Sequence, residues 1–125
     1  MAAKTYRDLL VWQRALDLVT HVYRLTQNVP RDEVYGLTSQ LRRAAVSVPS
    51  NIAEGQARRT TGDYIRFVSN AEGSLAELDT QLLIAVELNY IERSNSLECS
   101  ELMMEVRKML NALRRSLMAR LADKN

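Results

Sequence analysis

Apolar residues recur at the 3.6-residue period of an amphipathic helix along four long segments of this 125-residue chain, and this pattern constrains the fold most. We expect helices at about 8–28, 34–58, 61–89 and 96–121. The breaks between them are short and polar, so consecutive helices should run antiparallel. Glycine (4) and proline (2) are too scarce for turn-rich β structure. The sequence therefore predicts an all-α protein, a single antiparallel up-down-up-down four-helix bundle over residues 1–125.

Pro49 lies inside the second predicted helix, yet the apolar phase continues across it from Val48 to Ile52. This continuity predicts one helix with a proline kink rather than two helices. The kink costs ~3 kcal/mol or more, because the ring crowds the carbonyl of Ala45 and offers it no N–H. A polar stripe that accompanies the apolar one offers side-chain hydrogen bonds around the bend: Gln40, Ser47, Asn51, Glu54 and Arg58. A solvent-facing polar edge with a tolerated kink is the alternative.

The first predicted helix is apolar on two nearly opposite sides. One stripe comprises Leu9, Trp12, Leu16, Val19 and Tyr23, and the other comprises Val11, Ala15, Leu18, Val22 and Leu25. We expect the first stripe to enter the core, which should include Trp12, Leu16, Leu41, Val48, Leu75, Leu82, Val106 and Leu113. A helix that is apolar on two sides needs two partners, so the surplus surface predicts self-association. The expected oligomer interface consists of Val11, Leu18, Val22, Leu25, Gly73, Ile84 and Leu88.

The sequence carries no motif of an enzyme, and we expect no catalytic residue, metal or cofactor. The one histidine, His21, has no glutamate three residues before it and lies in a polar arc, so we interpret it as a surface residue. Glu72 and Asp79 border the core stripe of the third helix, and we interpret them as partners of arginines such as Arg42 or Arg43 rather than as an acid/base pair.

The cysteine content, the N-terminus and the length of the apolar runs together predict a cytoplasmic protein. Cys99 lacks a second cysteine for a disulfide and lies at core spacing, which is typical of a buried, inert thiol in a reducing compartment. The N-terminus lacks the pattern of a signal peptide. No apolar run approaches the ~20 residues of a membrane helix, so we expect no membrane contact.

Charge is unevenly distributed although the net charge is only +2. Residues 67–105 hold eight acids and one base, whereas residues 106–125 hold six bases and one acid. Two basic groups are candidates for binding nucleic acid: Arg58, Arg59 and Arg66, and Arg107, Lys108, Arg114 and Arg115. Such bases bind phosphates without regard to sequence, and they also pair with acids of a neighbouring helix or subunit. The sequence leaves both interpretations open.

Three stretches carry a resemblance to a known family: DLLVWQRALDLVTHVYRLT, VYGLTSQLRRAAVSVPSNIAEG and YIRFVSNAEGSLAELDTQLLIAVELNYI. They resemble a small bacterial family of four-helix bundles named after proteins encoded in intervening sequences of 23S ribosomal RNA. That family also includes the accessory variability determinant of diversity-generating retroelements. The similarity runs from about Tyr6 to Leu113. Its most specific part is a structural motif formed by Ser47, Pro49, Asn51, Ile52, Ala53, Glu54 and Gly55.

The resemblance implies a bundle that assembles into a homo-oligomeric ring, with pentamers the expected form, and it implies no catalytic residues. The variability-determinant branch is associated with RNA and a reverse transcriptase through basic surface. The leading hypothesis is therefore a non-enzymatic, homo-oligomeric scaffold or adaptor that contacts structured RNA or an RNA-associated protein. The alternative is a purely protein-binding oligomer whose basic residues serve assembly, with no role in binding nucleic acid.

Overall fold

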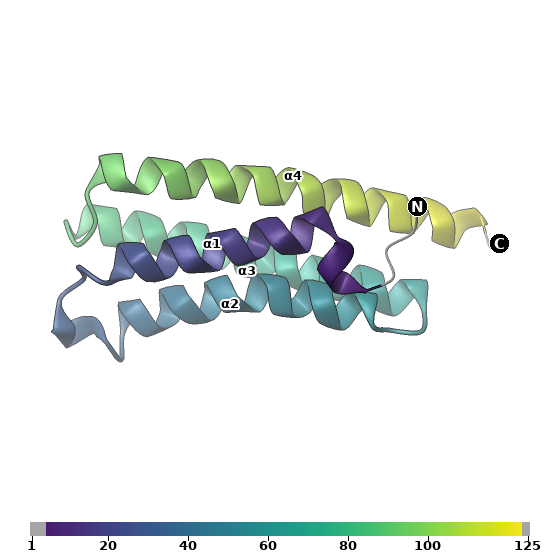
Figure 1. Ribbon diagram of the computed structural model, residues 1–125, viewed down its shortest axis with the longest axis horizontal. Coiled ribbons are helices and arrows are strands. Elements are labelled where there is room, and N and C mark those ends of the chain that lie inside the picture. The colour runs from purple at the N-terminus through teal and green to yellow at the C-terminus, as the bar shows by residue number, and fades with distance from the viewer. Residues whose placement is uncertain (1–4, 124–125) are drawn as a thin grey trace.

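Four long helices lie side by side along one axis in the computed structural model, which describes residues 5–123 (Figure 1). They are α1 (Leu10–Thr26), α2 (Leu37–Gln56), α3 (Thr61–Glu87) and α4 (Arg93–Asp123). Two short 3₁₀ helices precede α1 and α2: η1 (Tyr6–Asp8) and η2 (Arg31–Glu33). The described residues contain no strand. The predicted all-α helical bundle is confirmed, and consecutive helices are joined at alternate ends (Figure 1).

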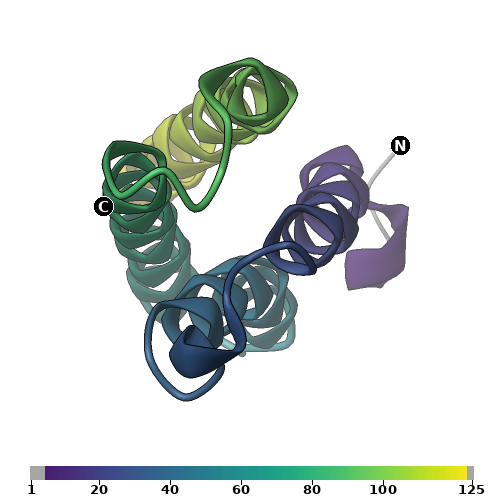
Figure 2. The same cartoon turned by 90° about the vertical axis from the view of Figure 1, so that its left-hand side faces the viewer.

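Each helix contacts its neighbours in the order of the chain, and α1 also contacts α4 (Figure 2). Helices α1 and α3 are therefore diagonal to each other, as are α2 and α4. The apolar core runs along the middle of this arrangement. Its most deeply buried large side chains come from all four helices: Leu18, Val22, Leu41, Val48, Ile52, Val68, Leu75, Leu78, Met103, Val106, Leu110 and Leu117.

Local chemistry explains where the helices begin and end. Thr60 caps α3, because its Oγ1 accepts a hydrogen bond of 3.1 Å from the N–H of Asp63. Helix α3 ends near Asn89, whose φ of 61° is a left-handed conformation that asparagine tolerates. Helix α2 begins at Leu37, three residues later than predicted, because Arg31–Glu33 form a separate 3₁₀ turn. Helix α4 begins three residues earlier than predicted, at Arg93.

Helix α2 continues through Pro49, which is buried, so the prediction of one helix rather than two is confirmed. A bend at Pro49 stays a prediction. The core prediction is also confirmed for Leu41, Val48, Leu75, Leu82 and Val106, which are all buried. Leu113 is partly buried and packs against the core.

The predicted core face of α1 is wrong. Leu18 and Val22 are almost completely buried, whereas Leu16 and Tyr23 are 39% and 40% exposed. Trp12 is only partly buried. Both stripes have the same helical period, so spacing alone does not choose between them. The buried stripe is aliphatic and contains the small Ala15, whereas the outer stripe carries Trp12 and Tyr23, whose N–H and O–H groups need polar partners.

Candidate nucleic-acid interface and uncovered surfaces

The first predicted basic group lies at the end of the bundle where α2 ends, α3 begins and α4 ends (Figure 1), whereas the second, from Arg107 to Arg115, lies at least two turns before the last residue of α4. Arg58 and Arg59 follow the last turn of α2, and Arg66 lies in the second turn of α3. Arg120, near the end of α4, is close enough to Tyr64 for its positive charge to oppose the rise that burial causes in the pKa of the Tyr64 hydroxyl. We call Arg58, Arg59, Arg66 and Arg120 the basic end.

Two arginines of the basic end lie against one aromatic ring. The guanidinium carbons of Arg58 and Arg66 are 4.5 Å and 4.9 Å from the centroid of Phe67. Each also faces an acid within its own segment: Arg58 is 4.0 Å from Glu54, and Arg66 is 3.7 Å from Asp63. These distances are too long for hydrogen bonds, and exposed ion pairs of this kind contribute only about 0–1 kcal/mol. Within residues 5–123, Arg59 and Arg120 have no ion pair.

The other predicted nucleic-acid residues divide into two groups. Arg114 is partly buried, and its Nε donates a hydrogen bond of 2.9 Å to Glu72 while its Nη2 donates one of 2.7 Å to Asn111. Arg107 faces Asp79 at 3.8 Å. These two guanidiniums therefore join α4 to α3. Lys108 and Arg115 are exposed, so their predicted role in binding nucleic acid stays a prediction.

The same contacts correct the predicted partners of Glu72 and Asp79. Arginines do pair with both acids, but they are Arg114 and Arg107 of α4 rather than Arg42 or Arg43 of α2. Arg42 instead lies over the ring of Tyr23, 4.4 Å from its centroid, and donates a hydrogen bond of 2.9 Å to Thr26 Oγ1. The sequence pattern could not show this, because it does not tell which neighbouring helix the acids face.

The structural motif in α2 makes its contacts with α3. Ser47 and Ser74 share a hydrogen bond between their Oγ atoms at 2.8 Å. Asn51 Nδ2 donates to the Ser47 carbonyl at 2.8 Å and to Ser47 Oγ at 2.9 Å. A Cβ added at Gly55 would lie 2.8 Å from Phe67 Cβ, so only glycine permits this close approach of α3 to α2. The predicted hydrogen bonds beside Pro49 therefore exist, and they come mainly from Asn51.

Three residues of the predicted oligomer interface are wrongly assigned. Val11, Leu18 and Val22 are buried within the single chain, so they offer no surface to a second copy. Leu25 is partly buried against the same core. Ile84 and Leu88 are about half exposed, and Gly73 is exposed with no atom within 4 Å of the place where a Cβ would lie. For these three residues, an intersubunit role stays a prediction.

Uncovered apolar side chains instead gather beside two different pairs of helices. On the first side, Tyr23 of α1 meets Arg42 of α2, and Leu16 and Val46 lie at helical spacing from these residues. Val34 and Tyr35 line the same shallow cavity of about 430 Å³ as Tyr23 and Val46. We define the α1–α2 face as the exposed residues Leu16, Tyr23, Val34, Tyr35 and Val46.

The second side lies over α3 and α4. Leu83 is one turn after Asp79, and Met104 is one turn before Arg107, so the Asp79–Arg107 ion pair places both beside the same seam. We define the α3–α4 face as the exposed residues Leu83, Ile84, Leu97 and Met104. Because the helices contact one another in cyclic order, the α1–α2 face and the α3–α4 face lie on opposite sides of the bundle (Figure 2).

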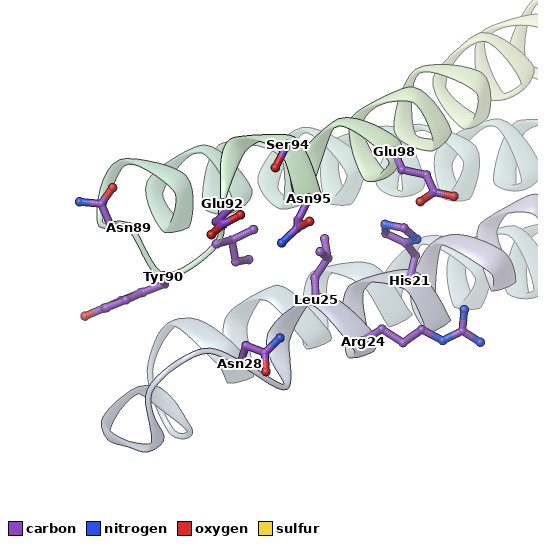
Figure 3. Close-up of a pocket in the computed structure, with 11 residues that line it drawn as sticks. His21, Arg24, Leu25, Asn28, Asn89, Tyr90, Glu92, Ser94, Asn95 and Glu98 are labelled. Carbon is purple, nitrogen blue, oxygen red and sulfur yellow. The ribbon is translucent and has the colours of Figure 1, made fainter.

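Two cavities lie between α1 and α4, and most of the residues that line them are polar. One of about 650 Å³ is bordered by His21 and Arg24 of α1, by Asn28 just after this helix and by the segment 89–98 (Figure 3). A second of about 450 Å³ continues along the same seam as far as Arg14 and Glu105, whose side chains are joined by a hydrogen bond of 3.0 Å. His21 was predicted as a surface residue, but its Nε2 is shielded from solvent and has no hydrogen-bond partner among residues 5–123.

The described residues offer no reactive thiol and no cluster of metal ligands. Cys99 is completely buried, as predicted, and burial raises the pKa of its thiol to about 12, with a smaller contribution from Asp79. Within the described residues, no three His, Cys, Asp or Glu side chains gather as metal ligands. Across residues 5–123, no helix combines the length and hydropathy that a bilayer crossing needs.

These features define a helical bundle with a basic end and two uncovered apolar faces. The sequence matches the family of 23S rRNA-intervening sequence proteins over residues 7–112, so the chain belongs to this family. Its fold is similar to the crystal structure of a protein of unknown function from the S23 ribosomal protein family of Bacteroides thetaiotaomicron. The TM-score is 0.75 at 19% identity, over 84% of this chain and 98% of that one. No curated protein matches the sequence.

Proposed function

We propose that the protein is a non-enzymatic, homo-oligomeric scaffold of the cytoplasm whose basic end contacts structured RNA. The observation that carries the scaffold is the presence of two uncovered apolar faces on opposite sides of one bundle. Exposed apolar patches of this kind mark interaction sites. Because the two faces differ, copies that join one face to the other associate head to tail, and such contacts close into a ring when the rotation permits. A pentamer is the form that the family resemblance implies.

The charges near the two faces support their pairing. Arg42 and Arg43 border the α1–α2 face. Glu87 follows Leu83 by one turn of α3, and Glu101 lies between Leu97 and Met104 on α4, so acids border the α3–α4 face. Opposite charges around apolar centres favour the encounter of these two faces over that of either face with itself.

Molar mass in solution tests this assembly. Wild-type protein at micromolar concentration should elute as a multimer in size-exclusion chromatography with light scattering. Val46→Glu places a charge in the α1–α2 face, and Leu83→Lys places one in the α3–α4 face. Each variant alone should therefore be monomeric. A mixture of the two variants still holds one intact α1–α2 face and one intact α3–α4 face, and it should form a dimer of one copy of each. A monomeric wild type would overturn the scaffold, and two homodimeric variants would overturn head-to-tail pairing.

The RNA contact is supported by the convergence of four arginines at the basic end. The family that the chain resembles also includes the variability determinant of diversity-generating retroelements, a branch associated with RNA, but no motif assigns this chain to that branch. Binding should weaken steeply between 50 and 200 mM salt, because phosphate contacts release counterions. Fluorescence anisotropy with a labelled RNA hairpin measures this. Wild-type protein that binds no RNA at 50 mM salt would remove the RNA contact and leave the scaffold standing.

The second candidate function is a purely protein-binding oligomer. It is favoured by the Arg114–Glu72 and Arg107–Asp79 contacts, in which bases of α4 join α3 rather than face outward. Arg59→Glu combined with Arg115→Glu separates the two candidates, because both side chains are exposed. Loss of RNA binding with an unchanged molar mass supports the scaffold that contacts RNA. Loss of assembly supports the purely protein-binding oligomer.

A further inference from the structure

Two guanidiniums lie over the ring of Phe67, one from the connection between α2 and α3 and one from α3 itself. Arg58 reaches it from the end of α2, and Arg66 reaches it from its own helix, α3. A guanidinium that stacks on a ring uses its flat face for this contact, and its N–H groups lie along its edges. The stacking therefore fixes the position of each charge and leaves donors for a ligand.

The position of the ring is itself fixed by the packing of α2 on α3. Phe67 is only 8% exposed, and its Cβ lies where a side chain at position 55 would have to be. Tyr64 also packs against Gly55, and its Cδ1 lies 3.0 Å from the position that a Cβ of residue 55 would take. Gly55 thus lets two aromatic residues of α3 rest on α2. Arg66 is part of α3, and Arg58 lies two residues after the last residue of α2, in the short connection to α3.

We propose that Arg58 and Arg66, held on Phe67, form a paired site for neighbouring phosphodiester groups of one nucleic-acid backbone. We call it the Arg58–Phe67–Arg66 clamp. The choice of RNA as the nucleic acid that it binds rests on the proposed function. Each guanidinium presents two parallel N–H donors that match two phosphate oxygens, a geometry that lysine lacks. A phosphodiester displaces Glu54 and Asp63 easily, since their contacts with the arginines are long and partly solvated.

The charges around the clamp favour a polyanion over a small free anion. Arg59 and Arg120 stand at the same end without an ion pair within residues 5–123. A single phosphate engages one guanidinium, whereas a backbone presents a row of phosphates to several arginines at once. The clamp reads no base, so it binds without sequence preference.

Variants that keep the net charge test the geometry. In anisotropy titrations of the full chain with an RNA hairpin at 50 mM salt, the Arg58→Lys/Arg66→Lys double variant should weaken binding about fivefold, because lysine lacks the fork. Phe67→Leu should weaken it severalfold, since it removes the stacking while all charges remain. Arg31→Ala, which deletes a charge at the opposite end, should stay within about twofold. Far-UV circular dichroism and thermal melts show whether Phe67→Leu is folded, and the lysine variant changes only exposed side chains.

The outcomes separate the clamp from the proposed function. A double lysine variant that binds as tightly as the wild type would overturn the clamp, even though RNA binding stands. Wild-type protein that binds neither RNA nor DNA would overturn both. A DNA hairpin of the same sequence serves as the second arm: tighter binding of DNA keeps the clamp and overturns the choice of RNA. Inorganic phosphate at millimolar concentration should compete poorly, and efficient competition would overturn the preference for a backbone.

Discussion

Ser47 of α2 and Ser74 of α3 share a hydrogen bond between their Oγ atoms across the boundary of the two helices. Asn51 completes the arrangement, because its amide donates both to Ser47 Oγ and to the Ser47 carbonyl. Within the polar stripe beside Pro49, Ser47 and Asn51 are partly buried, whereas Gln40, Glu54 and Arg58 are exposed. The Ser47–Ser74 contact fixes the register of α2 against α3, and Asn51 lies one helical turn before the close approach at Gly55.

Removing this hydrogen bond should destabilise the bundle. We expect Ser47→Ala and Ser74→Ala each to lower the free energy of unfolding by about 1 kcal/mol, because each removes the hydrogen bond that joins α2 to α3. The double variant should lose less than the sum of the two, since the shared bond is lost only once. Urea denaturation measures the three values. Ser50→Ala, at an exposed position of α2, is the matched control and should stay within about 0.5 kcal/mol of wild type. Additive effects of the two changes would contradict a shared bond.

Two glycines should respond to alanine with opposite signs. Gly55→Ala places a methyl group 2.8 Å from Phe67 Cβ, and we expect this overpacking to cost about 1–3 kcal/mol. Gly73→Ala meets no atom within 4 Å in the middle of α3, so it should stabilise the chain by about 0.5–1 kcal/mol through helix propensity. Thermal melts give both values. If Gly73→Ala instead lowers the molar mass of the assembly, Gly73 lies at a close approach between copies, as the sequence predicted.

The thiol of Cys99 should be unreactive in the folded protein. Its pKa is raised to about 12 by burial, so almost no thiolate forms at pH 8. Labelling with a thiol reagent should follow global unfolding, and urea should accelerate it. Fast labelling of native protein would contradict the burial of Cys99.

The same pKa sets a pH dependence with a defined sign. The folded chain keeps the proton of Cys99 longer than the unfolded chain, whose thiol has its ordinary pKa of 9.0. This contribution to stability is fully present below pH 9 and falls between pH 9 and 12, by at most about 1.4 kcal/mol for each pH unit. Cys99→Ala should flatten that part of the curve in urea denaturation. An unchanged slope would show that other groups set the alkaline limit.

The Arg114–Glu72 contact should couple α4 to α3 more strongly than an exposed ion pair does. Its hydrogen bond is 2.9 Å long, and both side chains are largely shielded. A double-mutant cycle with Arg114→Ala and Glu72→Ala should give a coupling of about 1 kcal/mol or more. Arg93 and Glu87, 3.8 Å apart and exposed, form the control pair, whose coupling should be below about 0.5 kcal/mol. Equal couplings would contradict the importance of shielding.

Periodicity predicted the number and type of the long helices because each presents a continuous apolar stripe to the core. It failed on α1, where Leu16 and Leu18 belong to two equally periodic stripes and only the packing of all four helices decides between them. For the same reason, periodicity could not predict which residues of different helices contact each other. Glu72 showed that it needed an arginine, but its partner Arg114 is 42 residues further along the chain. Of the basic end, the sequence predicted Arg58, Arg59 and Arg66 as one group but not Arg120, since sequence does not show which helix ends meet.

Helix α4 is 31 residues long and α1 only 17, a difference of about 20 Å at the usual rise per residue. Figure 1 shows that the last turns of α4 extend past the start of α1. Leu117 is the last buried residue there, while Met118 and Leu121 are exposed. An isolated final turn has little intrinsic stability and frays. A second copy or a nucleic acid at Arg120 that covers this overhang should make the ellipticity at 222 nm more negative, so helix content becomes a direct readout of occupancy.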